Sequence, residues 1–240
     1  MDIETTLKDV ISDVKFFLKG GVTTLPLTIG GSMLIIGLFT ANYAMLFFLL
    51  GFLFAAPFLA WVINTVTALV PNNPFSVLST DMCRVSNPFR TMANAPATKE
   101  VSVVSEWLAM VLFFFGYMGF NAFQLLDIDP KVDGPMDDST SGKVSARKTQ
   151  ACMSLLAIVL VLIGVIMFRL RSNCEGFTAT TFTMVIGFIV SSLFLVGGGA
   201  WYYLLSLVGE NRLSDLFGIA NRLLGKDAMK NVPVACVPMP

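Results

Sequence analysis

The sequence predicts an all-α fold, a multi-pass bundle of about five transmembrane helices with amphipathic helices at both ends of the chain. Hydrophobic residues make up 55% of the chain and charged residues only 13%, whereas soluble domains carry about a quarter charged residues. Residues 178–208 contain no charged side chain, and this stretch is longer than the roughly 20 apolar residues that cross a bilayer. Trp201, Tyr202 and Tyr203 follow near its end, and such aromatic residues favour the membrane–water interface.

Residues 20–208 form a predicted transmembrane domain that contains five apolar stretches. The expected crossings are residues 22–41, 44–70, 101–126, 151–168 and 178–208. The first two are separated only by Asn42 and Tyr43, so they form an antiparallel hairpin. Pro57 predicts a kink in the second crossing, because proline removes one backbone hydrogen bond.

Two long polar segments connect the crossings. Residues 71–100 are rich in Pro and Asn, and loops of this length are usually functional or disordered. We expect this one to be ordered and to pack against something outside the bilayer. Residues 127–150 read as a second solvated loop, acidic and then basic.

Both ends of the chain carry helical periodicity. Residues 1–19 place apolar side chains at helical spacing (Ile3, Leu7, Val10, Ile11, Val14, Phe17 and Leu18). This predicts an amphipathic helix that Gly20 and Gly21 end. It lies on the membrane surface or a partner, or it packs on the protein's own membrane face. Residues 209–240 predict a second amphipathic helix and an apolar, proline-rich tail, which we expect to insert into a groove.

Several kinds of chemistry lack the residues that they need. The chain has no histidine, which removes the commonest general base and metal ligand. Charged residues avoid the middle of every crossing, whereas pumps and coupled transporters carry them there. The aspartates that begin at Asp127 lack the terminal Glu of a calcium loop. Zero net charge argues against nucleic acid as a partner. We therefore expect no enzyme activity, catalytic residue, metal or cofactor.

A few residues remain as candidates for a specific role. Cys83 and Cys174 fall on the same side of the predicted topology, so they pair as a disulfide if that side is oxidising, and otherwise stay free. Glu106, Asn121 and Gln124 in the third crossing are candidates for a polar pathway or for helix contacts. The glycine triplet 197–199 is typical of close helix packing rather than of an ion filter.

The orientation of the bundle does not follow from its charges. Five crossings place the two termini on opposite sides of the membrane. Lysine and arginine residues enriched on one side normally identify the cytoplasmic face. Each side of this topology carries eight of the 16, so the rule assigns no orientation.

The overall plan resembles the small hydrophobic multi-pass proteins in the internal membrane of large, chlorovirus-like icosahedral DNA viruses. The resemblance lies in the charged amino terminus, the histidine-free hairpins rich in Phe and Met, and the tail LSDLFGIANRLLGKDAMKNVPVACVPMP. It implies a structural protein of the virion internal membrane that contacts capsid or minor capsid proteins through residues 71–100 and 209–240. The alternative is a small channel, carrier or membrane-trafficking protein of a cellular membrane.

Overall fold

The chain forms a helical bundle. The computed structural model describes residues 3–39, 43–70, 103–127, 138–171, 175 and 180–208. Within these ranges the structure contains no strand and comprises α1 (Ile3–Phe39), α2 (Tyr43–Leu50), the π-helical turn η1 (Gly51–Ala55), α3 (Ala56–Ala68), α4 (Glu106–Asp127), α5 (Asp138–Arg171) and α6 (Thr181–Val208).

Five segments of this bundle are long and apolar enough to cross a membrane. They are Gly20–Phe39, Met45–Ala68, Glu106–Gln124, Lys148–Arg171 and Thr181–Leu204. The predicted all-α, multi-pass fold is therefore confirmed, and the chain is an integral membrane protein.

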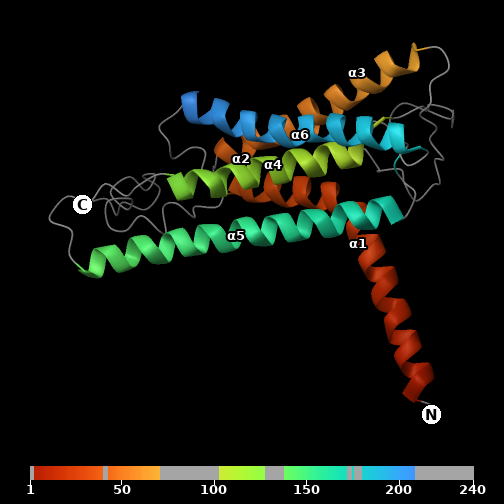
Figure 1. The fold of residues 1–240 in the computed structure, drawn as a ribbon, viewed down its shortest axis with the longest axis horizontal. Helices are drawn as coiled ribbons and strands as arrows, with labels where there is room; N and C mark the ends of the chain where they lie inside the picture. Colours follow the sequence, from red (N-terminus) through yellow and green to blue (C-terminus); the bar gives the residue numbers. More distant parts are fainter. Residues whose placement is uncertain are drawn as a thin grey trace.

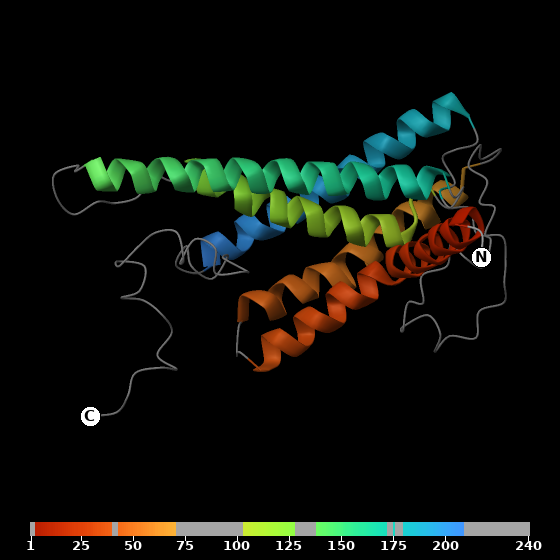
Figure 2. The same ribbon diagram turned by 90° about the horizontal axis from the view of Figure 1, so that it is seen from below.

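Helix α4 is the centre of the bundle. It packs against α6, α5, α3 and α1, and it lies between α6 and α5 in Figure 1 and between α5 and α1 in Figure 2. In its apolar segment 67% of the residues are buried, against 6% in α5. The outer helix α5 therefore packs on the core with one side only, which includes Ile158, Leu162 and Val165, and it leaves its other side exposed.

Aromatic rings fill the core between α2, α4 and α6. The Phe48 ring packs edge-on against Tyr117, with centroids 4.9 Å apart, and Tyr117 packs against Tyr202 at 5.2 Å. Phe113 contacts Trp201 at 6.2 Å. Edge-to-face pairs at such distances add to the stabilisation from burial alone. This interlocking set fixes how the three helices pack against each other.

Glycines bring the backbones of α4 and α6 into direct contact. A Cβ atom added to Gly116 would overlap the carbonyl oxygen of Leu195, and one added to Gly198 would overlap that of Phe113. Small residues let helices approach in this way within a membrane. The expectation of close packing at the glycine triplet is confirmed at Gly198, whereas a Cβ on Gly197 would meet nothing within 4 Å.

Two helices extend further than the sequence predicted. The prediction that Gly20 and Gly21 end the first helix is wrong, because α1 continues through both to Phe39. A glycine costs a helix about 1 kcal/mol relative to alanine, which weakens it without ending it. The predicted loop 127–150 is also wrong in part, because α5 already begins at Asp138. No proline interrupts residues 138–150, and an acidic residue favours a helix start.

The remaining segment predictions differ in how far they are tested. Helices α4 and α6 lie inside the predicted crossings 101–126 and 178–208 to within a few residues. The loop at residues 71–100 and the tail at residues 209–240 lie outside the described residues.

Candidate functional site

The most polar buried site of the described structure lies at one end of the bundle, where α5 ends and α4 and α6 begin. We call it the Arg169 cluster: Ser105, Trp107, Arg169 and Glu175. The Nε atom of Arg169 lies 3.1 Å from Oε1 of Glu175. Both residues are 2% exposed. An ion pair this well buried needs further hydrogen bonds to offset the cost of removing two charges from water.

Ser105 supplies several of those hydrogen bonds. Its hydroxyl donates to Glu175 Oε1 over 2.8 Å, and its backbone N–H donates to Oε2 over 3.3 Å. The same hydroxyl oxygen accepts bonds from Arg169 Nη2 at 3.4 Å and from the Leu108 amide at 3.1 Å. The bond from Leu108 caps the first turn of α4. Ser105 therefore uses its one donor and both its lone pairs.

Trp107 connects the ion pair to α1. The guanidinium carbon of Arg169 lies 4.5 Å from the centroid of its ring, a cation–π contact. Its indole N–H donates to the carbonyl oxygens of Val22 at 3.1 Å and Thr23 at 3.2 Å. In a regular helix the Val22 carbonyl would accept from residue 26, which is Pro26 and has no N–H. Trp107 therefore replaces the donor that proline removes.

Asn64 in α3 fixes the segment that leads into α4. Its side-chain amide donates to the Val104 carbonyl oxygen at 3.0 Å, and its Oδ1 accepts from the Val103 amide at 2.9 Å. Val103 and Val104 are both fully buried. Buried backbone groups need such partners, so this amide compensates for a non-helical stretch inside the bundle.

Burial and ion pairing shift the pKa of the Glu175 carboxyl group in opposite directions. Removal from water raises the pKa of its carboxyl group above the ordinary range, while the Arg169 charge and the bonds from Ser105 lower it; the effect of burial is the larger. The proton of this buried acid is consequently held more tightly in the folded chain than in the unfolded chain.

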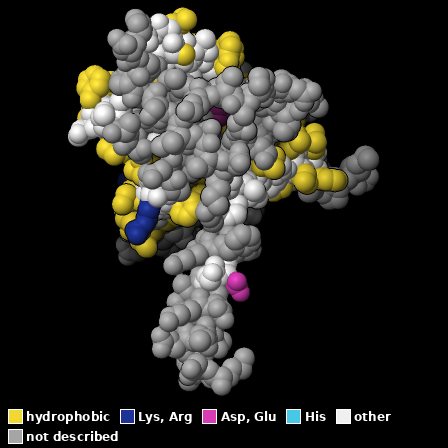
Figure 3. Space-filling model, turned by 90° about the vertical axis from the view of Figure 1, so that its right-hand side faces the viewer, with side chains coloured by type: hydrophobic (Ala, Val, Ile, Leu, Met, Phe, Trp, Pro, Cys, Tyr) yellow, Lys and Arg dark blue, Asp and Glu magenta, His cyan; other side chains and the backbone are white. Residues whose placement is uncertain are grey.

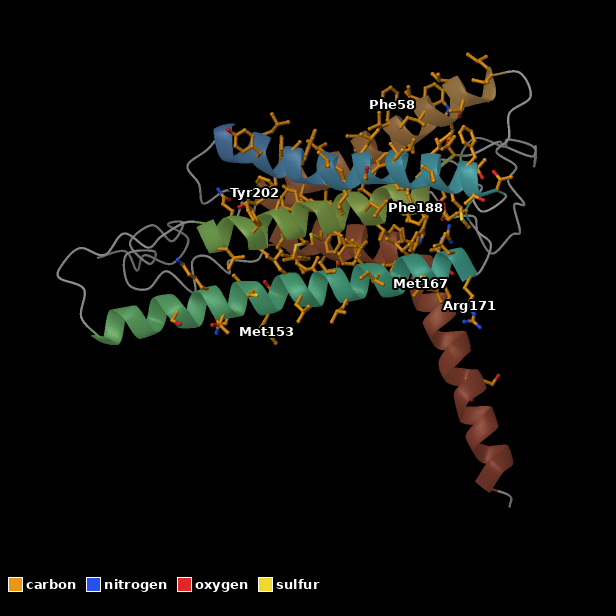
Figure 4. The ribbon with its side chains drawn as sticks, in the orientation of Figure 1. Phe58, Met153, Met167, Arg171, Phe188 and Tyr202 are labelled. Atoms are coloured by element: carbon orange, nitrogen blue, oxygen red, sulfur yellow. The ribbon has the colours of Figure 1, made fainter. Side chains whose placement is uncertain are left out.

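The three candidate polar residues of α4 do not form one site. Glu106 is the first residue of α4, near the Arg169 cluster. Asn121 and Gln124 lie towards the opposite end, where Asn121 is buried and Gln124 Oε1 accepts a hydrogen bond from the Tyr202 hydroxyl. Figure 4 shows Tyr202 on the side of α6 that faces α4. The aromatic core described above lies between the two ends.

Pro57 lies directly after a local change of helix type. It is buried near the start of α3, and the π-helical turn η1 precedes it. Within η1 the Ala56 amide donates to the Gly51 carbonyl oxygen, five residues back. The indole N–H of Trp201 donates to the carbonyl oxygen of Phe47 at 3.1 Å, just before this turn. At both irregular points, Pro26 and η1, a tryptophan from a neighbouring helix thus donates a hydrogen bond to a backbone carbonyl oxygen.

The cysteine and calcium hypotheses fall largely outside the described residues. Cys83 and Cys174 are not described, so their pairing stays a prediction. Cys152 is free and exposed on α5. The aspartates that follow Asp127 as far as residue 137 are likewise not described, and elsewhere the described residues contain no cluster of three candidate metal ligands.

The sequence did not predict the Arg169 cluster. Arg169 stands at the charged end of the fourth apolar stretch, which is an ordinary place for an arginine, and no sequence motif marks Glu175 or Ser105. Ser105 and Glu175 are 70 positions apart, and no local pattern joins them. The available signal was an arginine at the end of an apolar run, followed six residues later by a glutamate.

Comparisons with known proteins add no relationship. The chain matches no protein-family model, no curated protein and no solved structure.

Proposed function

We propose that the chain is a non-catalytic structural protein of a membrane that belongs to a large assembly. The observation that carries this proposal is the use of buried polar groups to join helices. Arg169, Glu175 and Ser105 bond to one another, and Trp107 bonds to α1. Polar groups that are paired in this way make a bundle rigid and specify one arrangement of its helices.

The surface of the bundle fits the same role. Exposed apolar side chains run along α5 from Met153 to Met167, and Met153 lies on the outer side of this helix in Figure 4. In the view from the end that holds the Arg169 cluster, hydrophobic side chains lie around the sides of the described part (Figure 3). Such a surface suits contact with lipid and with the membrane segments of neighbouring proteins.

The more specific form of the proposal is a component of a virion internal membrane beneath a capsid. It rests on the resemblance in overall plan and tail sequence. The contacts with capsid or minor capsid proteins would then come from residues 71–100 and 209–240.

Gentle detergent extraction from the native source, followed by sizing and mass spectrometry, tests both forms. We expect the protein in a stoichiometric complex with other proteins of its assembly, and with capsid proteins if the viral form holds. A small homo-oligomer recovered without other proteins would contradict the structural role.

A channel or carrier is the second candidate, and the observation that favours it is the buried Asn121 together with the half-buried Gln124 near one end of α4. It requires ion or solute flux through vesicles that contain the purified protein. Glu106→Gln and Gln124→Leu would then each change this flux. Under the structural proposal, the wild-type protein and both variants show only the leakage of empty vesicles.

A further inference from the structure

The first part of α1 leaves the bundle. In Figure 1 the N-terminal part of this helix points steeply away from the other helices, while its later part runs along them. Val22 and Leu25 are among its residues that pack on the core. Gly20 and Gly21 are exposed, a Cβ on either would meet nothing within 4 Å, and Ser12 and Asp13 are also exposed. At these four positions the first part of α1 is therefore not covered by the rest of the bundle.

The point of departure coincides with the end of the membrane-spanning region. Trp107 holds the α1 backbone at Val22 and Thr23 and contacts Arg169 with its ring. The apolar segment of α5 ends at Arg171, and that of α1 begins at Gly20. Tryptophan and arginine at helix ends mark the interface of a bilayer. Residues 3–19 thus start at the membrane surface and run sideways from a bundle whose axis crosses the membrane.

The sequence of this part suits an interface rather than water or hydrocarbon. Its apolar residues recur with the helical period (Ile3, Leu7, Val10, Ile11, Val14, Phe17 and Leu18), so they share one side of a helix about 25 Å long. The charged residues over the same range are Glu4, Lys8, Asp9, Asp13, Lys15 and Lys19. These are equal numbers of each sign, so they attract neither anionic nor cationic lipid strongly.

We propose that residues 3–19 of α1 lie in the plane of the bilayer interface beside the bundle, with the headgroup region of zwitterionic lipid as the partner of their apolar side. The steep turn at the start of the first crossing places this segment. Trp107 fixes the turn through the carbonyl oxygens of Val22 and Thr23, and the first of these is the one that Pro26 leaves without a helical donor.

The test uses the full chain in phosphatidylcholine vesicles. All four native cysteines are first changed to serine, and a nitroxide is then attached at one introduced cysteine at a time. Val14→Cys reports on the apolar side of the segment, and Ser12→Cys reports on the opposite side of the same helix. Leu160→Cys, exposed in the middle of α5, provides the reference for a label in the membrane. Val10→Cys provides a second site on the apolar side. The measured quantities are the collision rates with oxygen, which concentrates in lipid, and with a water-soluble nickel chelate.

We expect the oxygen-to-nickel ratio to be several-fold higher at Val14 and Val10 than at Ser12, and highest at Leu160. Equal exposure of Val14 and Ser12 to nickel would overturn the proposal, because the segment would then project into water. If the labels at Val14 and Ser12 were both shielded from oxygen and from nickel, the segment would contact protein and the proposal would be overturned. A Leu160 label that is accessible to nickel as in water would instead contradict the membrane bundle itself.

Added anionic lipid should leave the oxygen-to-nickel ratio at Val14 unchanged. An increase in this ratio that salt reverses would overturn the choice of zwitterionic lipid.

Discussion

At the scale of single residues, the Arg169–Glu175 pair makes an asymmetric prediction. Arg169→Met removes the cation bonded to a buried carboxylate, and breaking a buried pair from one side costs about 3–5 kcal/mol. Glu175→Gln should cost less, because the amide oxygen still accepts from Ser105 and burial already favours an uncharged group there. Unfolding in detergent, followed by circular dichroism, measures both changes. Arg171→Met is the matched control, since Arg171 is exposed two residues away and should change stability by less than about 0.5 kcal/mol.

The same carboxyl group predicts a pH dependence. Its pKa is raised in the folded chain, so between the unfolded and the folded pKa the folded state binds more protons than the unfolded state. The contribution of Glu175 to stability is therefore fully present below the ordinary glutamate range and is lost as the pH rises through the folded pKa. Unfolding measured across this range should show wild-type stability falling with rising pH, and Glu175→Gln should lack that component. An identical slope in both proteins would contradict the assignment to Glu175.

Trp107 provides a further prediction that a double-mutant cycle can isolate. Trp107→Phe keeps an aromatic ring but removes the N–H that bonds to the Val22 carbonyl oxygen. Leaving a fully buried acceptor without its donor costs about 1–3 kcal/mol. Because Val22 is half-buried, we expect a loss at the lower end of this range. Pro26→Ala restores a backbone N–H to α1, so the double variant should lose less stability than the sum of the two single losses. Strict additivity would show that the indole does not compensate for Pro26.

At the scale of elements, the contact between α4 and α6 depends on two glycines. Gly198→Ala places a methyl group against the carbonyl oxygen of Phe113, and such overpacking typically costs about 1–3 kcal/mol. Gly197→Ala is the natural control on the same helix, because nothing lies within 4 Å of its added methyl group. That variant should gain up to about 1 kcal/mol from helix propensity. The two thermal midpoints should therefore move in opposite directions, and equal shifts would refute close packing at Gly198.

The elements also show where sequence patterns stop being informative. Hydropathy locates crossings because their length and apolar composition are local properties, and α4 and α6 accordingly match the predicted ranges to within a few residues. The start of α5 at Asp138 lies in polar sequence, where no apolar period marks a helix. The Arg169 cluster requires Arg169 at the end of α5 and Glu175 beyond it to meet Ser105 and Trp107 at the start of α4. That meeting follows from tertiary packing alone, so neither spacing nor composition predicts it.

At the scale of the whole molecule, the number of crossings determines where the ends of the chain lie. Within the described residues five helices are long and apolar enough to cross the membrane, and the first part of α1 does not add another crossing because it turns away at the level of Trp107. An odd number of crossings puts the two termini on opposite sides of the membrane.

In sealed vesicles that hold the protein in one orientation, external protease should remove a tag from one end and leave a tag at the other intact until detergent is added. Removal of both tags from intact vesicles would require an even number of crossings, and one of the five helices would then have to lie outside the hydrocarbon core. Because α5 has the smallest buried share of the five, it would be the first to examine, through the accessibility of a label at Leu160.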